Sequence, residues 1–111
     1  MDNMVVLKAI ADETRMGILT LLLGRSYCVR ALARQLNLSE ATISQHLKML
    51  REAGLVAGEK RGYFTHYDVD RGALTRLARE IDALAAIERA TCPHKNGEGS
   101  APHGHCQCHR P

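Results

Sequence analysis

The chain has 111 residues, of which 45% are hydrophobic and only 4% aromatic, and its net charge is +3 at pH 7 with neutral histidines. This length allows one small domain and a tail, and the scarcity of aromatic residues favours an aliphatic core between packed helices. The longest apolar run, 18–23, is too short to span a bilayer, and the acidic N-terminus lacks the features of a secretory signal. We therefore expect a cytoplasmic protein with reduced thiols.

The first half of the chain has the pattern of consecutive helices. Asn37 is suited to the left-handed end of one helix, and Ser39, two residues later, is suited to cap the next, which Gly54 would end. A tight turn is therefore expected between the third and fourth helices. The helices are expected over residues 3–11, 12–24, 26–36 and 40–53.

The second half predicts a β-hairpin and one long helix. Residues 55–60 and 63–69 have the composition of two strands joined by a turn at Arg61-Gly62. A last helix is expected from Asp70 to Arg89, with apolar residues at i, i+3, i+4 and i+7. This apolar stripe either pairs with its copy in a second chain or packs on the first helix of the same chain, and the two contacts are compatible.

Two helices joined by a tight turn and followed by a hairpin form the order of a winged helix-turn-helix, in which the second helix reads double-stranded DNA. We therefore predict a mainly α fold with a small β-hairpin. His46 has a second interpretation, as a hydrogen-bonded histidine that supports helix packing. The candidate DNA-contacting residues carry hydroxyl, amide, imidazole or cationic groups: Ser39, Thr42, Ser44, Gln45, His46, Lys48, Arg51, Lys60, Arg61 and Tyr63.

Three segments resemble the ArsR/SmtB family of metal-responsive repressors. They are LKAIADETR at 7–15, SEATISQHLKMLREAGLV at 39–56, and KRGY at 60–63 together with Tyr67. The resemblance implies a homodimer, formed through the first and last helices, that binds an inverted-repeat operator and is released by an inducer. The periodicity itself does not distinguish repression from activation.

The chain departs from both metal sites that are common in this family. Where the family's arsenic-type sites have Cys-Val-Cys, this sequence has Cys28-Val29-Arg30, and a cation disfavours a metal cation beside it. The last helix lacks the histidine of the family's other site. Cys28 is then a replacement for a capping serine, a reactive thiol or an auxiliary metal ligand.

The C-terminal segment 90–111 is rich in thiol and imidazole donors, so we divide the chain into a domain over 1–89 and a flexible metal-binding tail over 90–111. Three thiolates suit As(III) or Sb(III), by analogy with the family; three thiolates and an imidazole suit Zn(II) or Cd(II), and Cu(I) is a further candidate. The alternative is a disordered tail with incidental donors. The expected ligands are Cys92, Cys106, Cys108, His105 and His109, with His94, His103 and Cys28 as auxiliary candidates.

Three further hypotheses remain open. The inducer is alternatively an oxidant or a persulfide that joins the same cysteines, and the Cys92-Pro93 pair is also of a kind that binds haem. A protein of another class, a metal buffer or delivery protein without DNA binding, would share the metal-binding tail. We do not expect an enzyme, because the sequence pairs no nucleophile with a base and has no phosphate-binding glycine loop.

Overall fold

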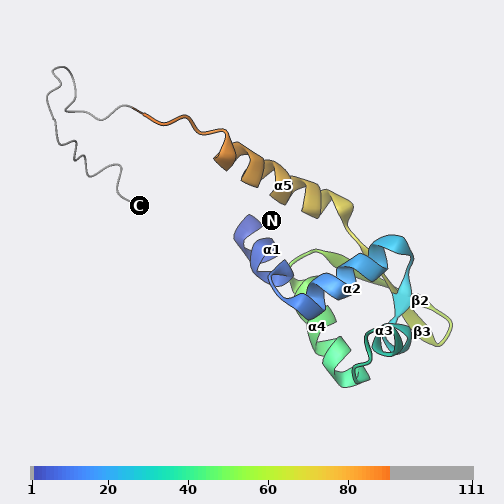
Figure 1. The fold of residues 1–111 in the computed structure, drawn as a ribbon. Helices are drawn as coiled ribbons and strands as arrows, with labels where there is room; N and C mark the ends of the chain where they lie inside the picture. Colours follow the sequence, from blue (N-terminus) through green and yellow to red (C-terminus); the bar gives the residue numbers. More distant parts are fainter. Residues whose placement is uncertain (1, 91–111) are drawn as a thin grey trace, which may run out of the picture.

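The computed structural model describes residues 2–90, which form five helices and one small sheet (Figure 1). The architecture confirms the predicted winged helix-turn-helix, mainly helical with a β-hairpin after the fourth helix. No helix in this part of the chain is long and apolar enough to cross a membrane. The elements are α1 (Asn3–Ile10), α2 (Glu13–Gly24), β1 (Tyr27–Cys28), α3 (Val29–Leu36), α4 (Glu40–Glu52), β2 (Val56–Arg61), β3 (Phe64–Val69) and α5 (Arg71–Ala85).

Four of the five helices begin at a side chain that accepts a hydrogen bond from a backbone N–H of the first turn. Such a cap satisfies one of the donors that a helix start leaves without a partner. The helix starts predicted at residues 12–14, at Ser39 and at Asp70 are confirmed. The capping residues are Asp2, Asp12, Ser39 and Asp70.

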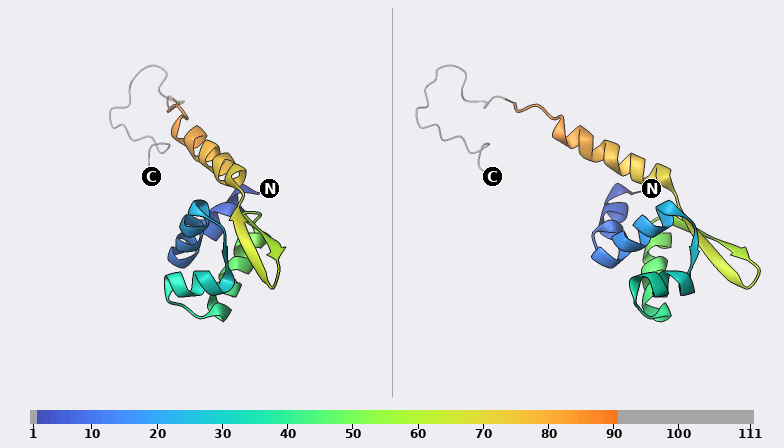
Figure 2. Two further views of the ribbon diagram at one scale, coloured as in Figure 1. Left: turned by 90° about the vertical axis from the view of Figure 1, so that its right-hand side faces the viewer. Right: turned by 45° about the vertical axis from the view of Figure 1, so that its right-hand side comes forward.

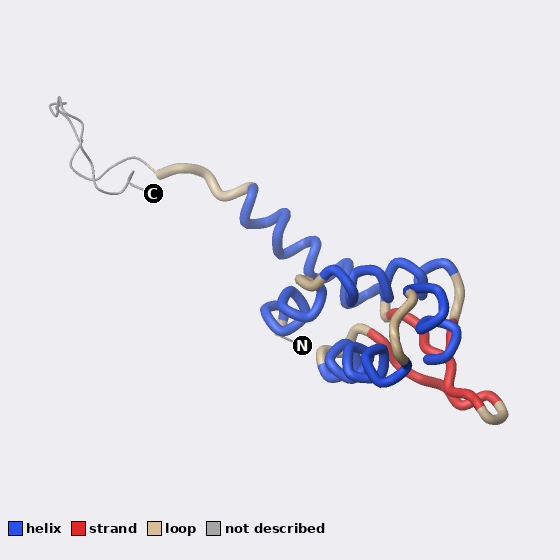
Figure 3. Tube along the Cα trace, turned by 60° about the horizontal axis from the view of Figure 1, so that its bottom comes forward, coloured by secondary structure: helices blue, strands red, loops and turns tan. Residues whose placement is uncertain are grey.

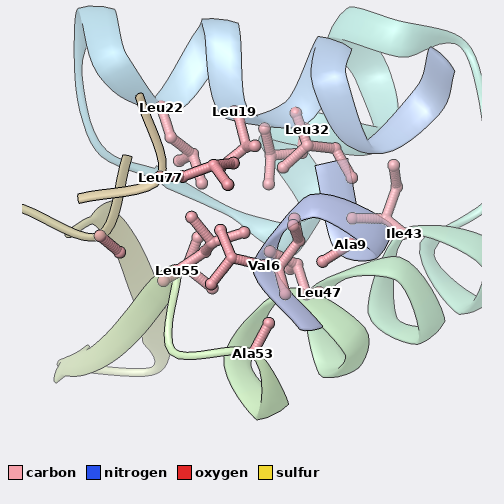
Figure 4. Close-up of a cluster of buried hydrophobic side chains, with 14 of the residues drawn as sticks. Val6, Ala9, Leu19, Leu22, Leu32, Ile43, Leu47, Ala53, Leu55 and Leu77 are labelled. Atoms are coloured by element: carbon pink, nitrogen blue, oxygen red, sulfur yellow. The ribbon is translucent and has the colours of Figure 1, made fainter. Parts of the chain in front are cut away.

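One continuous aliphatic core joins the helices (Figure 4). Burying each large side chain contributes roughly 1.5–3 kcal/mol, so the core sets the positions of the helices. Helix α2 is not buried on all sides, because Met16 is 47% exposed on its outer side. The largest fully buried side chains are Val6, Ile18, Leu19, Leu32, Ile43, Leu47, Leu50 and Leu55.

The turn between α3 and α4 is the short left-handed one predicted from the sequence. Asn37 has φ 57° and ψ 48°, and the N–H of Leu38 donates to the carbonyl of Ala33 at 3.0 Å. This arrangement ends α3 and places Ser39, the N-cap of α4, two residues after Asn37. The short connection fixes the angle between the two helices.

The sheet has three strands in the order β1-β3-β2, and its β2–β3 hairpin projects from the helical body (Figure 3). The hairpin turns at Gly62 and Tyr63, one residue later than expected, and Gly62 has φ 68°. The prediction that residues 26–28 begin a helix is wrong. Tyr27 and Cys28 instead pair with Tyr67 and His66 of β3, a contact between distant segments that local patterns do not reveal.

Helix α5 packs on α1 near its middle, and its C-terminal end extends away from the body (Figures 1 and 2). Leu77 is buried, and the Asn3 side-chain amide donates to Glu80 at 2.7 Å. The helix ends at Ala85 rather than at the predicted Arg89. Every residue from Ala78 to Ala90 is exposed, so the end at Ala85 does not coincide with a loss of packing in the single chain.

Candidate nucleic-acid interface

Helix α4 has one face in the core and one face toward solvent. The buried side chains are Ile43, Leu47 and Leu50. Ser44, Gln45 and Lys48 are exposed between them, as the helical period requires. The outer face therefore presents a hydroxyl, an amide and an ammonium group together, which is the chemistry that base edges and phosphates accept.

The N-terminal turn of α4 uses two of the predicted DNA-contacting residues for its own structure. The Ser39 hydroxyl oxygen accepts from the backbone N–H of Thr42 at 3.1 Å, and the Ser39 hydroxyl donates to the Thr42 hydroxyl at 2.9 Å. Both groups therefore set the start of the helix, whereas Ser44 carries the first hydroxyl beyond the cap. Arg51, in the last turn, is exposed as predicted.

His46 lies at the edge between the two faces and is half-buried. Its Nδ1 atom is 3.3 Å from Nη1 of Arg15 and 3.9 Å from a carboxylate oxygen of Asp12. The backbone N–H of Arg15 lowers the pKa of the Asp12 carboxyl, with a smaller contribution from the Arg15 charge. His46 thus has the contacts of a packing histidine, while a direct DNA contact through Nε2 stays a prediction.

The two cations expected at the hairpin tip have different surroundings. Arg61 forms a 3.0 Å ion pair with Glu59 and lies 3.4 Å from the Ser26 hydroxyl, whereas Lys60 has no ion pair within residues 2–90. Tyr63 is 96% exposed at the tip. Lys60 and Tyr63 are therefore the hairpin groups available to a partner, and Arg61 is partly neutralised.

Two arginines of α3 were not among the residues predicted to contact DNA. Arg30 and Arg34, one helical turn apart, line an open groove of about 410 Å³ together with Ser39 at the start of α4. Arg30 also lines a hollow of about 340 Å³ that extends to Tyr63 of the hairpin. The i, i+4 spacing of the two arginines is the feature of the sequence that indicates this cationic face.

Cys28 occupies the N-cap position of α3, as the sequence indicated, but its side chain makes no capping hydrogen bond. It is half-buried and faces His66 across the β1–β3 pair. Within the part of the chain that the structure describes, no three Cys, His, Asp or Glu side chains are grouped to hold a metal ion. An ion at Cys28 would therefore need ligands from elsewhere.

The predicted metal ligands of the tail lie outside the described residues. These are Cys92, Cys106, Cys108, His105 and His109, with the auxiliary candidates His94 and His103. The ligand set stays a prediction from the sequence.

Comparisons with known proteins agree with this architecture. The family model "Bacterial regulatory protein, arsR family" matches residues 12–57. An arsenical resistance operon repressor of Escherichia coli (strain K12) is 44% identical over 81 residues, which cover 71% of this chain and 62% of the relative, less than two thirds of its length. The transcriptional repressor SdpR of Bacillus subtilis (strain 168) is 36% identical over 69 residues, which cover 62% of this chain and 77% of the SdpR chain.

Solved structures show the same arrangement of elements. An ArsR-like transcriptional regulator from Rhodococcus sp. RHA1 is similar with a TM-score of 0.70 and 33% identity over 76% of this chain and 79% of that one. A homodimeric winged helix-turn-helix DNA-binding domain from Mycobacterium bovis, from a possible ArsR-family regulator, has a TM-score of 0.62 and 27% identity over 78% and 82% of the two chains. The chain belongs to the ArsR/SmtB family of bacterial transcriptional regulators.

Proposed function

We propose that the chain is a transcriptional repressor that binds operator DNA as a homodimer and releases it when a thiophilic ion binds the C-terminal cysteines. The observation that carries DNA binding is the exposed polar face of α4, held on a buried apolar face beside a projecting hairpin. This is the arrangement in which a helix enters the major groove and a wing follows the backbone. The two curated relatives described above are both named repressors, whereas HlyU of Vibrio cholerae, 43% identical over 57% of this chain, is named an activator, so repression is the first direction to test.

The dimer is supported by apolar side chains that the single chain leaves exposed on α1 and α5. Met4 is 55% exposed, Ile81 47%, Leu84 63% and Ile87, just beyond α5, 71%. Met4, Ile81 and Leu84 line a groove of about 400 Å³ between the two helices. A second copy would cover these side chains, and a two-fold dimer would present two copies of α4 to successive half-sites.

The proposed sensor is the tail, because the described residues supply too few ligands for an ion. Cys92, Cys106 and Cys108 would provide thiolates, with His105 or His109 as an additional ligand. Three thiolates match the preference of As(III), and three thiolates with one imidazole match tetrahedral Zn(II) or Cd(II). The family relative named for arsenical resistance supports a metalloid as the first ion to test.

Release follows if the ion prefers a dimer in which the two copies of α4 no longer fit successive major grooves. Such a preference is a coupling free energy between two sites, typically about 1–3 kcal/mol, and it must be reciprocal. Operator DNA should therefore weaken ion binding by the same factor by which the ion weakens DNA binding. Equal ion affinity of the free and DNA-bound dimer would contradict the proposal.

The test is a titration of the reduced protein on its own promoter DNA with As(III), Zn(II), Cd(II) and Cu(I), followed by fluorescence anisotropy. We expect salt-dependent binding to the duplex and release by at least one of these ions. Release by an oxidant without added metal, with loss of free thiols, would identify the redox-responsive alternative. Absence of duplex binding at low salt would leave the metal buffer as the better account.

A further inference from the structure

One guanidinium group joins three helices of this domain. From the first turn of α2, Arg15 Nε donates to the carbonyl oxygen of Ala9 at 2.6 Å, and its Nη2 donates to that of Lys8 at 3.4 Å. Both carbonyls belong to α1. On the other side, Nη1 of the same group lies 3.3 Å from Nδ1 of His46 and 3.4 Å from the sulfur of Met49.

The groups that Arg15 joins belong to the two functional ends of the molecule. Lys8 and Ala9 are at the end of α1, the helix whose first turn exposes Met4 to a second copy. His46 and Met49 are three residues apart on one side of α4, directly beside the exposed Gln45 and Lys48. Arg15 therefore spans the distance between the dimer helix and the proposed reading helix.

We propose that Arg15 is a positioning residue that holds the orientation of α4 relative to α1 through its bond to His46, and thereby sets the distance between the two reading helices of the dimer. This inference rests on the proposed function. Arg15 itself touches no DNA in this account. Arg15 affects DNA affinity through the preferred half-site spacing, because reading helices must be one DNA turn apart to occupy two half-sites at once.

We call the contacts of Arg15 with the carbonyls of Lys8 and Ala9 and with His46 the joint. It depends on the chemistry of both the arginine and the histidine side chain. A guanidinium has N–H donors on three nitrogens in a planar fork, so it reaches the α1 carbonyls and α4 together. A lysine ammonium has all its donors on one nitrogen and cannot replace both contacts. A guanidinium has only donors, so Nδ1 of His46 is the acceptor in its contact with Arg15. In a His46→Asn variant, the amide oxygen would stand near the position of Nδ1. In a His46→Gln variant, the longer side chain would place its amide near the position of Nε2 instead.

The first experiment measures half-site spacing with the full-length chain. A duplex is selected from a random-sequence pool with the wild-type protein, and versions of it are made with one to four base pairs inserted or removed between the half-sites. The wild type should bind one spacing best. Arg15→Gln and Arg15→Lys should lose about tenfold at that spacing and much less on a single half-site, with an unchanged salt slope.

Arg25→Gln is the matched control, since Arg25 lies over the Tyr27 ring at 5.4 Å and takes no part in the joint. It should keep the wild-type spacing profile. If Arg15→Gln also keeps the profile, the inference is wrong. A salt slope that falls by about one in Arg15→Gln would also overturn it, because Arg15 would then be a direct phosphate contact.

Three variants of His46 separate positioning from the competing roles. The variants are His46→Asn, His46→Gln and His46→Leu. If His46 is the acceptor for Arg15, the Asn variant should keep the spacing preference, and the Gln and Leu variants should both lose it. If His46 donates to DNA through Nε2, Gln should bind best. If only helix stability matters, Leu should be best, because Asn is the poorer helix former. The last two outcomes each contradict the inference.

Failure of the proposed function is distinguishable from failure of this inference. If the wild type enriches no duplex from the pool, DNA binding itself is wrong. If it enriches an inverted repeat but Arg15→Gln and the His46 variants show no change in spacing preference, only the joint is wrong. Thermal melting of each variant identifies any that fail to fold, and Arg15→Lys and His46→Asn keep the polar character of the site.

Discussion

The two ends of this domain expose opposite kinds of surface. At one end, α3, α4 and the hairpin present cationic and polar groups such as Arg30, Lys48 and Lys60. At the other end, α1 and α5 present aliphatic groups such as Met4 and Leu84, with 55% and 63% of their surface exposed. Charged groups lose little by contact with hydrated phosphate, whereas exposed aliphatic groups gain by contact with each other. In the proposed function, DNA binds the first end and a second protein copy binds the other.

The two ends depend on each other in the proposed mechanism. An ion bound after α5 acts at the apolar end, while its effect is measured at the polar end. The core between them is closely packed, and Arg15 adds a polar connection from α1 to α4. The following substitutions are intended to break one end while leaving the other intact.

The largest effect is expected from a charge in the apolar surface of α5. Leu84→Glu should give a monomer by sedimentation velocity, because the dimer would have to bury a carboxylate without a partner. Affinity for a two-half-site duplex should fall by about 100-fold or more, since the second contact is lost. Thr75→Glu is the control, with the same charge on an exposed position of the same helix. A dimeric Leu84→Glu would contradict the assigned interface.

A smaller and more selective effect is expected at the polar face of α4. Gln45→Ala should remove discrimination at about one base pair per half-site, a loss of roughly 1–3 kcal/mol, and leave non-specific binding unchanged. Competition between the selected duplex and its single-base variants measures this loss. Thr75→Ala, at an exposed position of α5 and away from α4, should retain the wild-type base preference. Equal base preferences in wild type and Gln45→Ala would place base recognition elsewhere.

The cations of the hairpin and α3 should contribute to DNA binding according to whether an acidic side chain already pairs with them in the free protein. Lys60→Gln and Arg30→Gln should each lower the salt slope of DNA binding by about one, because each removes a phosphate contact. Arg61→Gln should change it less, since Glu59 pairs with Arg61 at 3.0 Å. Affinity measured between about 50 and 200 mM salt gives these slopes. A larger effect at Arg61 than at Lys60 would reverse the ranking.

The smallest effect is on stability in acid. The Arg15 N–H lowers the pKa of the Asp12 carboxyl, so the charged carboxylate stabilises the folded state. This contribution is complete above the usual aspartate pKa and is lost as pH falls through the lower folded-state value. Wild type should therefore exceed Asp12→Asn in melting temperature near neutral pH, and the gap should narrow in acid. A gap that widens on acidification would contradict this sign.

Local features of this fold were predictable from the sequence because neighbouring residues cause them. The caps at Asp12, Ser39 and Asp70 and the left-handed Asn37 depend on side chains within a few residues. The exposed positions of α4 follow from the spacing of its apolar residues.

Features that depend on distant contacts were missed. Strand β1 exists because Tyr27 meets Tyr67, and the helix predicted there gives way to that pairing. The groove between α3 and α4 and the contact between Arg15 and His46 arise only when the helices are packed. The end of α5 at Ala85 was also missed, and the residues on both sides of it are equally exposed.

The central claim is that an ion held by the tail cysteines releases the domain from DNA. Its most direct test compares two full-length variants, Cys92→Ser/Cys106→Ser/Cys108→Ser and Cys28→Ser, on the promoter duplex while As(III) is added. Both should bind DNA within about twofold of the wild type, and only Cys28→Ser should be released as the wild type is. Release of the triple variant, or retention of Cys28→Ser, would contradict the account.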